Sequence, residues 1–258
     1  MAGRSNLKTD SKLPEDAPKL NWFMPQPTSI LIPALNEEEP IIRVLAEIPE
    51  VLCHQIIVVD NGSVDRTAER AKNCGAQVVV EKRRGYGNAC LAGIHHIRAG
   101  TEVVVFLDAD HSDYPEELPL LTRPIYEGRY DLVLGSRSLI RENRSFLRFH
   151  QAWGNRICLM LIRLFYGFQF SDMGPFRAIR YKSLTKLGLK DLTWGWNAEM
   201  QIRAVQEGLR ILEVPVRYRE RIGQSKISGT LRGSLAAGLR ILHTILKHWK
   251  IHPHSEGA

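Results

Sequence analysis

Short apolar runs alternate with amphipathic segments along the first half of the chain. The runs that predict strands are residues 28–33, 55–60, 77–81 and 103–107. Helices are expected at 38–47 and 87–98, and Ser63 or Asp65 is expected as the N-cap of a third helix. Later strands are expected at 132–136 and 211–218. Strands that alternate with helices indicate parallel crossovers, so we expect an α/β fold with a mostly parallel sheet and helices on both faces.

The segment from Val103 to Asp110 is the most informative part of this pattern. A continuous apolar strand ends there on two carboxylates one residue apart, Asp108 and Asp110. An apolar run without alternation is typical of a strand covered on both faces, and in open α/β sheets ligands bind at the carboxyl ends of such strands. Carboxylate oxygens at this edge suit Mg²⁺ or Mn²⁺, which leave coordination positions open for substrate phosphates.

The three preceding strands also end in polar loops, at residues 33–37, 60–63 and 83–87. Because the carboxyl ends of parallel strands meet at one edge, the four loops together predict a ligand site. A dinucleotide-binding fold is the competing interpretation. However, Gly85-x-Gly87-x-x-Cys90 lacks the third glycine and follows the third strand rather than the first. The two glycines still allow a ligand to approach the backbone, and Arg83 or Arg84 could contact phosphate.

Composition places the chain in a broad class. With 258 residues and 44% apolar content it can bury a sizeable core, and we favour one large domain over two small ones. The four cysteines show no paired spacing and no Cys-x-x-Cys motif, so neither a disulfide framework nor a zinc site is indicated. The first residues are polar and carry no secretory signal. A reducing, cytoplasmic location is therefore expected.

Basic charge is concentrated in two segments that are also rich in apolar residues. The net charge is +7, and six arginines between residues 137 and 163 are opposed only by Glu142. Eight basic residues between 217 and 250 are opposed only by Glu220. On a helix, one stripe would contain Arg144, Arg148, Arg156 and Arg163. Such a stripe beside aromatic and aliphatic residues is typical of a helix that lies in a membrane interface.

The two basic segments allow other interpretations. Amphipathic helices that dock on their own domain would show the same pattern. Nucleic acid is a weaker explanation, because no recognised binding motif accompanies the basic residues. Charges interrupt both segments too often for a helix that spans a bilayer. We therefore expect no nucleic-acid partner, and any membrane contact would be peripheral, on the cytoplasmic face.

Seven motifs follow one another in an order that is itself informative. They are PALNEE from residue 33, VVDNGSVDRT from 58, EKRRGYGNAC from 81, FLDADHSDYPEE from 106, SDMGPFRAI from 171, GWNAEMQIRA from 195 and RIGQSK from 221. Together they resemble the family 2 inverting glycosyltransferases with the GT-A fold, and most closely the dolichyl- and polyprenyl-phosphate hexose synthases. The resemblance covers about residues 28–230. It implies a GT-A domain at 28–230, preceded by a disordered lead-in at 1–27 and followed by a basic amphipathic tail at 231–258.

The resemblance also implies roles for the matching residues. Nucleotide-sugar binding is implied for Pro33, Leu35, Glu37, Asp60, Gly85, Ala89, Asp108, Ala109 and Asp110. Asp108 and Asp110 would also hold Mg²⁺ or Mn²⁺. Asp172 would lie near the donor sugar and acceptor, and Glu199 where related enzymes place a catalytic carboxylate. Arg221 and Lys226 would bind phosphates.

The implied reaction transfers a hexose from UDP-glucose or GDP-mannose to a polyprenyl or dolichyl phosphate. An alcohol acceptor would need a base such as Glu199 or Asp172, whereas a phosphate monoester is already largely ionised. Two alternatives stay open: a transferase that acts on a soluble or cell-envelope alcohol, and a non-catalytic nucleotide-sugar-binding protein. Two positions depart from the family pattern, Glu220 where an arginine is common and Ser112 where a glutamine is common.

Overall fold

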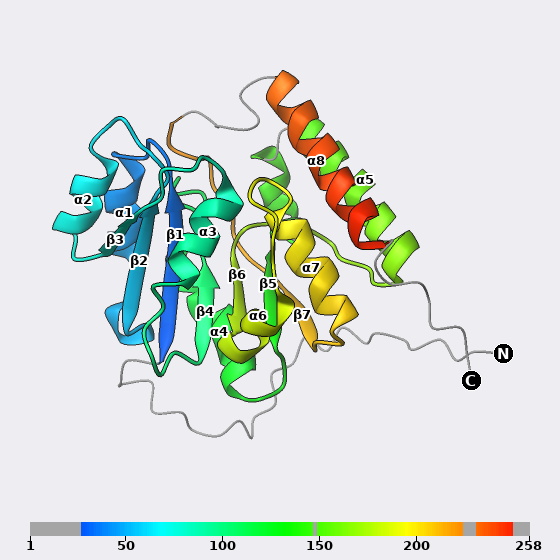
Figure 1. Cartoon of the computed structure of the whole chain (residues 1–258), viewed down its shortest axis with the longest axis horizontal. Coiled ribbons are helices and arrows are strands. Elements are labelled where there is room, and N and C mark those ends of the chain that lie inside the picture. Colours follow the sequence, from blue (N-terminus) through cyan, green and yellow to red (C-terminus); the bar gives the residue numbers. More distant parts are fainter. Residues whose placement is uncertain (1–26, 147–148, 224–230, 250–258) are drawn as a thin grey trace.

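A seven-stranded sheet forms the centre of the protein (Figure 1). The computed structural model describes residues 27–146, 149–223 and 231–249. The strands are β1 (Thr28–Ala34), β2 (Gln55–Asp60), β3 (Gln77–Val80), β4 (Val103–Phe106), β5 (Leu132–Ser136), β6 (Arg177–Arg180) and β7 (Ile211–Pro215). Their order in the sheet is β3-β2-β1-β4-β6-β5-β7. Only β6 runs antiparallel to its neighbours, β4 and β5, so the expectation of a mostly parallel sheet is confirmed.

The central strands are apolar because both of their faces are covered. Every residue of β4 is buried, as is all of β1 except Pro33. β1 pairs in parallel with β2 on one side and with β4 on the other, with Ile30 opposite Ile56 and Val105. The carboxyl ends of β1, β2 and β4 therefore meet at one edge, as the polar loops predicted.

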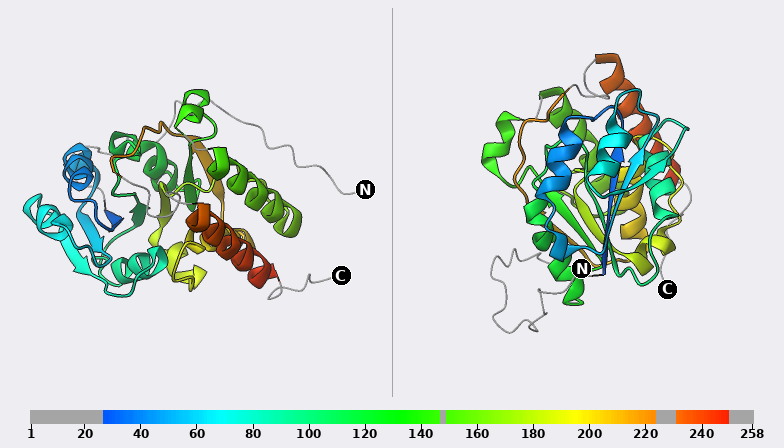
Figure 2. Two further views of the ribbon diagram at one scale, coloured as in Figure 1. Left: turned by 90° about the horizontal axis from the view of Figure 1, so that it is seen from above. Right: turned by 90° about the vertical axis from the view of Figure 1, so that its left-hand side faces the viewer.

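Helices cover the two faces of the sheet (Figure 2). They are α1 (Pro40–Glu47), α2 (Thr67–Asn73), α3 (Tyr86–Ile94), α4 (Leu118–Tyr126), α5 (Phe149–Tyr166), α6 (Tyr181–Leu187), α7 (Trp196–Gln206) and α8 (Leu231–Trp249), with short 3₁₀ turns at Glu50–Leu52, Pro115–Glu117 and Arg141–Ser145. Apolar side chains of α1, α2 and α4 pack on one face of the sheet, and those of α3 and α5 to α8 pack on the other. The expectation of helices on both faces is confirmed.

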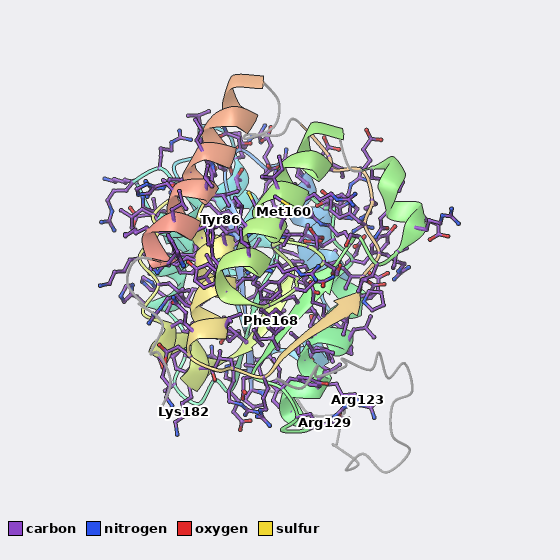
Figure 3. All side chains as sticks on the ribbon, turned by 90° about the vertical axis from the view of Figure 1, so that its right-hand side faces the viewer. Tyr86, Arg123, Arg129, Met160, Phe168 and Lys182 are labelled. Carbon is purple, nitrogen blue, oxygen red and sulfur yellow. The ribbon has the colours of Figure 1, made fainter. Side chains whose placement is uncertain are left out.

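Helices α5 and α8 lie side by side at one end of the sheet (Figures 1 and 3). Ile245 of α8 is fully buried in the core that α7 also joins. The Tyr166 hydroxyl of α5 donates a hydrogen bond to the Ile245 carbonyl at 2.6 Å, and the rings of Phe165 and Trp249 are 4.9 Å apart. No helix among the described residues is long and apolar enough to cross a membrane. The α8 helix is thus packed into the same core as the preceding domain.

Three elements differ from the sequence expectation. The helix expected at 87–98 ends at Ile94. The strand expected at 211–218 ends at Pro215, because no strand pairs with the residues that follow it. The antiparallel strand β6 was not predicted. Its sequence, Arg177-Ala-Ile-Arg180, contains only two apolar residues, and the fully buried Arg177 gives it a polar appearance.

Candidate active site

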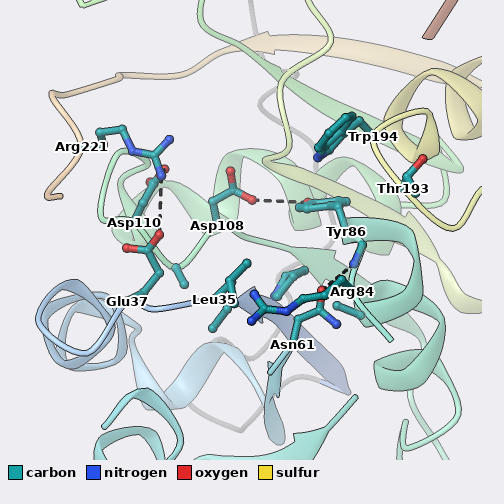
Figure 4. A pocket seen from close by; sticks show the side chains of 15 residues that line it. Leu35, Glu37, Asn61, Arg84, Tyr86, Asp108, Asp110, Thr193, Trp194 and Arg221 are labelled. Atoms are coloured by element: carbon teal, nitrogen blue, oxygen red, sulfur yellow. Dashed lines mark hydrogen bonds and ion pairs between the residues drawn. The ribbon is translucent and has the colours of Figure 1, made fainter. Parts of the chain in front are cut away.

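A cavity of about 310 Å³ opens at the carboxyl edge of the sheet (Figure 4). Its walls come from the loops after β1, β2 and β4, the start of α3, the α6–α7 loop and the segment after β7. The lining residues are Pro33, Ala34, Leu35, Glu37, Asn61, Arg84, Gly85, Tyr86, Ala89, Asp108, Ala109, Asp110, Thr193, Trp194 and Arg221. The four polar loops identified in the sequence therefore do contribute to one site.

The loop after β1 is locked onto the loop after β2. The Glu37 amide donates to Thr67 Oγ1 at 2.8 Å, and the Asn36 amide donates to the Ser63 hydroxyl at 2.9 Å. In return, Asn36 Oδ1 accepts from the Val64 amide at 2.8 Å. These bonds hold Asn36 at a positive φ of 51°, a conformation that asparagine tolerates better than most residues. They fix the backbone from which the buried Glu37 side chain extends.

Asn61 connects the loop after β2 to the loop before α3. Its Oδ1 accepts from the Gly85 amide at 2.8 Å, and its Nδ2 donates to the Arg83 and Glu81 carbonyls at 2.8 and 3.0 Å. Gly85 has a φ of 137°, and a Cβ there would lie 2.2 Å from the Leu192 carbonyl oxygen. Only glycine fits this position, where the turn contacts the α6–α7 loop.

Asp108 carries the clearest electrostatic signature in the cavity. Burial and the neighbouring Asp110 carboxylate raise the pKa of Asp108 to about 7, although Arg221, Arg137 and Tyr86 oppose the shift. The Tyr86 hydroxyl donates to Asp108 Oδ1 at 3.3 Å (Figure 4). Two enclosed carboxylates close enough to repel each other favour a bound cation.

Asp110 faces Arg221, which lines the cavity from the segment after β7. Arg221 Nη2 lies 2.8 Å from Asp110 Oδ2 and 3.6 Å from Glu37 Oε1. The other Asp110 oxygen accepts from the Ser112 amide at 2.9 Å. Because the Ile222 amide donates to the Asp110 carbonyl at 3.0 Å, Arg221 is held directly over the acidic pair.

A second cluster supports this acidic loop from outside the cavity. His111, at a positive φ of 64°, places its Nε2 2.8 Å from Glu47 Oε1. Arg219 pairs with the same Glu47 carboxylate and donates from Nε to the His111 carbonyl at 2.6 Å. Its amide donates to the Ser112 carbonyl at 3.0 Å. Arg219 therefore lies outside the cavity, while its neighbour Arg221 lines it.

The acidic pair fits a divalent cation better than it fits a closed structural site. No group of three metal-ligating side chains occurs among the described residues, so Asp108 and Asp110 would supply only part of a coordination sphere. Mg²⁺ and Mn²⁺ accept such incomplete protein sets and take further oxygens from water and phosphates. The adjacent Arg221 could neutralise phosphate charge at the same point.

Asp172 lies outside the set of residues that line the cavity. Its Oδ2 accepts from the Arg137 amide and Nε at 3.0 and 2.8 Å. Its Oδ1 accepts from Arg137 Nη2, Asn155 Nδ2 and the Met173 amide at 2.9, 3.0 and 2.8 Å. Burial raises the pKa of Asp172, but the Arg137 charge and these hydrogen bonds outweigh burial and hold the pKa below its usual range.

Glu199 is also outside the cavity lining and is only 1% exposed. Its Oε2 accepts from the Lys190 and Asp191 amides at 2.9 and 2.6 Å, and its Oε1 lies 3.1 Å from His248 Nε2. Burial raises the pKa of Glu199, but the His248 hydrogen bond and the two amides outweigh it and hold the pKa low. These contacts favour a positioning role, and the catalytic role of Glu199 stays a prediction.

The remaining predicted residues also divide into those that line the cavity and those that do not. The structure brings to the cavity Pro33, Leu35, Glu37, Gly85, Ala89, Asp108, Ala109, Asp110 and Arg221. Asp60 does not line it, and its carboxylate accepts from the Ser63 amide at 3.2 Å. Lys226 lies outside the described residues. Tyr86, Thr193 and Trp194 also line the cavity, although the sequence predicts no role for them. Tyr86 lies within the motif EKRRGYGNAC, whereas Thr193 and Trp194 belong to none of the seven motifs.

The sheet and its acidic edge define a glycosyltransferase of the GT-A fold. The model of the family described as "Glycosyl transferase family 2" matches residues 29–188, so the chain belongs to glycosyl transferase family 2. An uncharacterized glycosyltransferase of Mycobacterium tuberculosis is 38% identical over 86% of this chain and 96% of its own length. A dolichyl-phosphate hexose transferase of Haloferax volcanii is 33% identical over 85% of this chain and 94% of its own length.

A solved structure shows the same fold. It is glucosyl-3-phosphoglycerate synthase from Mycobacterium tuberculosis, in complex with Mn²⁺, UDP and glucosyl-3-phosphoglycerate. The TM-score is 0.69 and the sequence identity is 24%, with 90% of this chain and 82% of that chain covered. The expected family, fold and enzyme class are therefore confirmed.

Proposed function

We propose that this enzyme transfers a hexose from a nucleotide sugar to a polyprenyl or dolichyl phosphate, with inversion and with a divalent metal. UDP-glucose is the first candidate donor and GDP-mannose the second. The similarity to the Haloferax volcanii dolichyl-phosphate hexose transferase supports the acceptor class. The similarity to the fold that holds Mn²⁺ and UDP supports the donor class and the metal.

The cavity suits a nucleoside diphosphate. Pro33, Leu35 and Ala89 give it apolar wall on which a nucleoside can pack. Asp108 and Asp110 stand at the strand edge where a diphosphate would meet a metal. Arg84 and Arg221, at opposite sides of the cavity, provide positive charge for its phosphate oxygens (Figure 4).

The acidic pair explains how the leaving group is stabilised. Mg²⁺ or Mn²⁺ bound by Asp108 and Asp110 would neutralise negative charge on the departing nucleoside diphosphate. Arg221 would contribute a second positive charge at the same oxygens. Since Arg221 is paired with Asp110, nucleotide binding requires this arginine to exchange a carboxylate for a phosphate.

The hydrogen bonds of Asp172 and Glu199 are the observation from which we infer the class of acceptor. Both carboxylates are buried, fully engaged with donors and depressed in pKa, so neither is set up to remove a proton. An alcohol needs such a base. A lipid phosphate does not, because its second pKa of about 6 leaves it largely ionised at neutral pH. The saturated carboxylates therefore favour a phosphate nucleophile.

A soluble acceptor is the second candidate. The solved structure with the same fold contains glucosyl-3-phosphoglycerate, a water-soluble glucoside. An acceptor of that kind would reach the cavity without any membrane contact.

Peripheral contact with an anionic lipid surface would bring a lipid phosphate to the site. Helix α5 exposes Ile157, Met160 and Leu164, which are 48%, 59% and 71% accessible. Figure 3 shows Met160 on this helix. Arg156 and Arg163 are exposed on the same helix, and neither α5 nor α8 contains an acidic residue. Apolar side chains flanked by cations are the pattern of a helix that lies in a bilayer interface. We place this contact on the cytoplasmic face.

The decisive experiment is transfer of radiolabelled hexose from UDP-glucose and, separately, from GDP-mannose to polyprenyl phosphate in detergent. Each reaction is run with Mg²⁺, with Mn²⁺ and with EDTA. Labelled lipid that is lost with EDTA supports the proposal. Release of nucleoside diphosphate without labelled lipid supports a soluble acceptor, and no turnover with any donor indicates a binding protein.

A further inference from the structure

The α6–α7 loop, which supplies Thr193 and Trp194 to the cavity, contacts α3 on one side and α8 on the other. On one side it contacts the start of α3 through main-chain atoms. The Gly87 amide donates to the Thr193 carbonyl at 3.2 Å, and the Asn88 amide donates to the Leu192 carbonyl at 3.0 Å. A Cβ on Gly87 would lie 1.9 Å from the Asp191 carbonyl oxygen. The loop thus caps α3, which has no side-chain cap of its own.

On the other side, the loop is bound to α8 by Asp191. Its Oδ1 accepts from the Thr193 amide at 2.8 Å, which shapes the loop. Its Oδ2 accepts from Thr244 Oγ1 at 3.0 Å and from Arg240 Nε at 3.2 Å. Burial raises the pKa of Asp191, but the Thr193 amide, Thr244 and the Arg240 charge outweigh it and hold the pKa low. The carboxylate therefore stays ionised and paired.

Glu199 makes a second connection of the same kind. One of its oxygens binds the Lys190 and Asp191 amides of the loop, and the other faces His248 of α8. Arg240, Thr244 and His248 are spaced four residues apart, so they share one face of α8. Asp191, Glu199, Thr244 and His248 are all less than 10% exposed. The exposed apolar residues Leu239, Leu246 and Trp249 lie on other faces of this helix.

We propose that Asp191 and Glu199 are positioning residues that make the donor cavity depend on α8. They tie this helix to the loop whose Thr193 and Trp194 form one wall, so a shift of α8 changes the fit of the nucleotide sugar. The inference rests on the proposed donor site. It gives Glu199 a function other than proton transfer. It also connects the donor site with α8, which packs against α5, the helix proposed to meet lipid.

The test uses two α8 variants that cannot act as bases, Thr244→Val and His248→Gln, together with Glu199→Gln in the full chain. Hydrogen exchange of residues 190–194 is measured first, because it needs no ligand. Binding of Mn²⁺ with UDP or GDP, whichever wild type binds, is then measured by calorimetry. Steady-state KM and kcat complete the set. The matched control is Tyr166→Phe, which removes a hydrogen bond to α8 from the side of α5.

We expect all three variants to speed exchange in the loop and to weaken nucleotide binding about fivefold, with kcat within about twofold of wild type. Tyr166→Phe should change neither binding nor exchange in the loop. A loss of kcat of about a hundredfold in Glu199→Gln with unchanged affinity would overturn the proposal in favour of a catalytic base. Unchanged exchange in both α8 variants would also overturn it. Wild type that binds neither nucleotide contradicts the proposed function, while the exchange data still decide this inference.

Discussion

The carboxylates at the edge of β4 and those near α7 have opposite surroundings. The Asp108 carboxylate accepts a long hydrogen bond of 3.3 Å from Tyr86, and Asp110 is paired with an arginine that can turn to another anion. Asp172 and Glu199 instead have their oxygens occupied by amides, by Arg137 or by His248. Buried carboxylates with unfilled coordination bind ligands, whereas saturated ones hold the chain in place. Sequence spacing alone does not distinguish these two kinds.

The largest effect is expected for Asp110→Asn. This change removes a negative charge from the proposed metal site and leaves Arg221 without its main partner. We expect transfer to fall by about a hundredfold to a thousandfold, since losing a major electrostatic stabiliser costs about 2.7 to 4 kcal/mol in the transition state. Initial rates with saturating Mn²⁺ measure this loss.

The control for that variant is Glu116→Gln, which changes a half-exposed carboxylate in the same segment. It should keep wild-type activity. Thermal melting should show both variants folded. If Asp110→Asn turned over at the wild-type rate with metal, the assignment of the site to the β4 edge would be wrong.

The next largest effect is expected for Asp172, one of the carboxylates whose oxygens are fully hydrogen-bonded. Its substitution should lower the free energy of unfolding. Asp172→Asn removes the buried charge that balances the partly buried Arg137 and turns an amide NH₂ toward its guanidinium. Breaking a buried ion pair by removing one partner costs about 3 kcal/mol or more. Urea unfolding should show this loss. If Asp172→Asn were as stable as wild type but inactive, Asp172 would instead belong with the catalytic carboxylates.

Most of the sheet, and the residues of its acidic edge, could be predicted from the sequence. The apolar runs before Asp60 and Asp108 are long enough to define buried parallel strands, and parallel strands place their following loops together. The chemistry of Asp172 and Glu199 could not be predicted in this way. It depends on Arg137 after β5, Asn155 of α5 and His248 of α8, which are distant in sequence from these carboxylates and meet them only in the folded chain.

The part of the cavity wall that the α6–α7 loop forms could not be predicted from the sequence either. Thr193 and Trp194 belong to a loop without metal-ligating or phosphate-binding spacing. Their place follows from main-chain contacts of Asp191 and Leu192 with the Gly85–Gly87 turn. The sequence predicts that Gly85 and Gly87 let a ligand approach the backbone. In the structure it is the α6–α7 loop of the protein itself that lies against both glycines.

A pH series on Asp108→Asn gives a smaller effect that still separates the two classes. The raised pKa of Asp108, about 7, means that the folded protein keeps a proton between about pH 4 and pH 7 that the unfolded chain has lost. Ionisation of Asp108 therefore destabilises the metal-free protein as pH rises through this range. Asparagine removes that penalty, so the variant should gain stability over wild type at pH 8 but not at pH 4.

The gain at pH 8 should be on the order of 1 kcal/mol or more, measured by urea unfolding in EDTA. Asp172 has a lowered pKa in the folded protein. Its ionised carboxylate therefore stabilises the fold at pH values above its pKa in the unfolded chain, and this stabilisation is lost as the pH falls. The two groups thus predict opposite pH trends. A gain from Asp108→Asn that was the same at pH 4 and pH 8 would contradict the raised pKa that burial and the Asp110 carboxylate give Asp108.

The smallest effect is expected for Asp60→Asn. It tests a carboxylate that belongs neither to the ligand-accessible pair Asp108 and Asp110 nor to the fully hydrogen-bonded pair Asp172 and Glu199. The family resemblance implies that Asp60 holds the nucleoside, yet its buried carboxylate accepts from the Ser63 amide and does not line the cavity. An asparagine oxygen can accept the same bond. We expect nucleotide affinity, measured by calorimetry with Mn²⁺, to fall by only about twofold to threefold, because a neutral acceptor loses little where no charge is contacted. A loss of more than about tenfold with unchanged stability would show that the carboxylate binds the base directly, and Asp60 would then join Asp108 and Asp110 among the carboxylates kept available for a ligand.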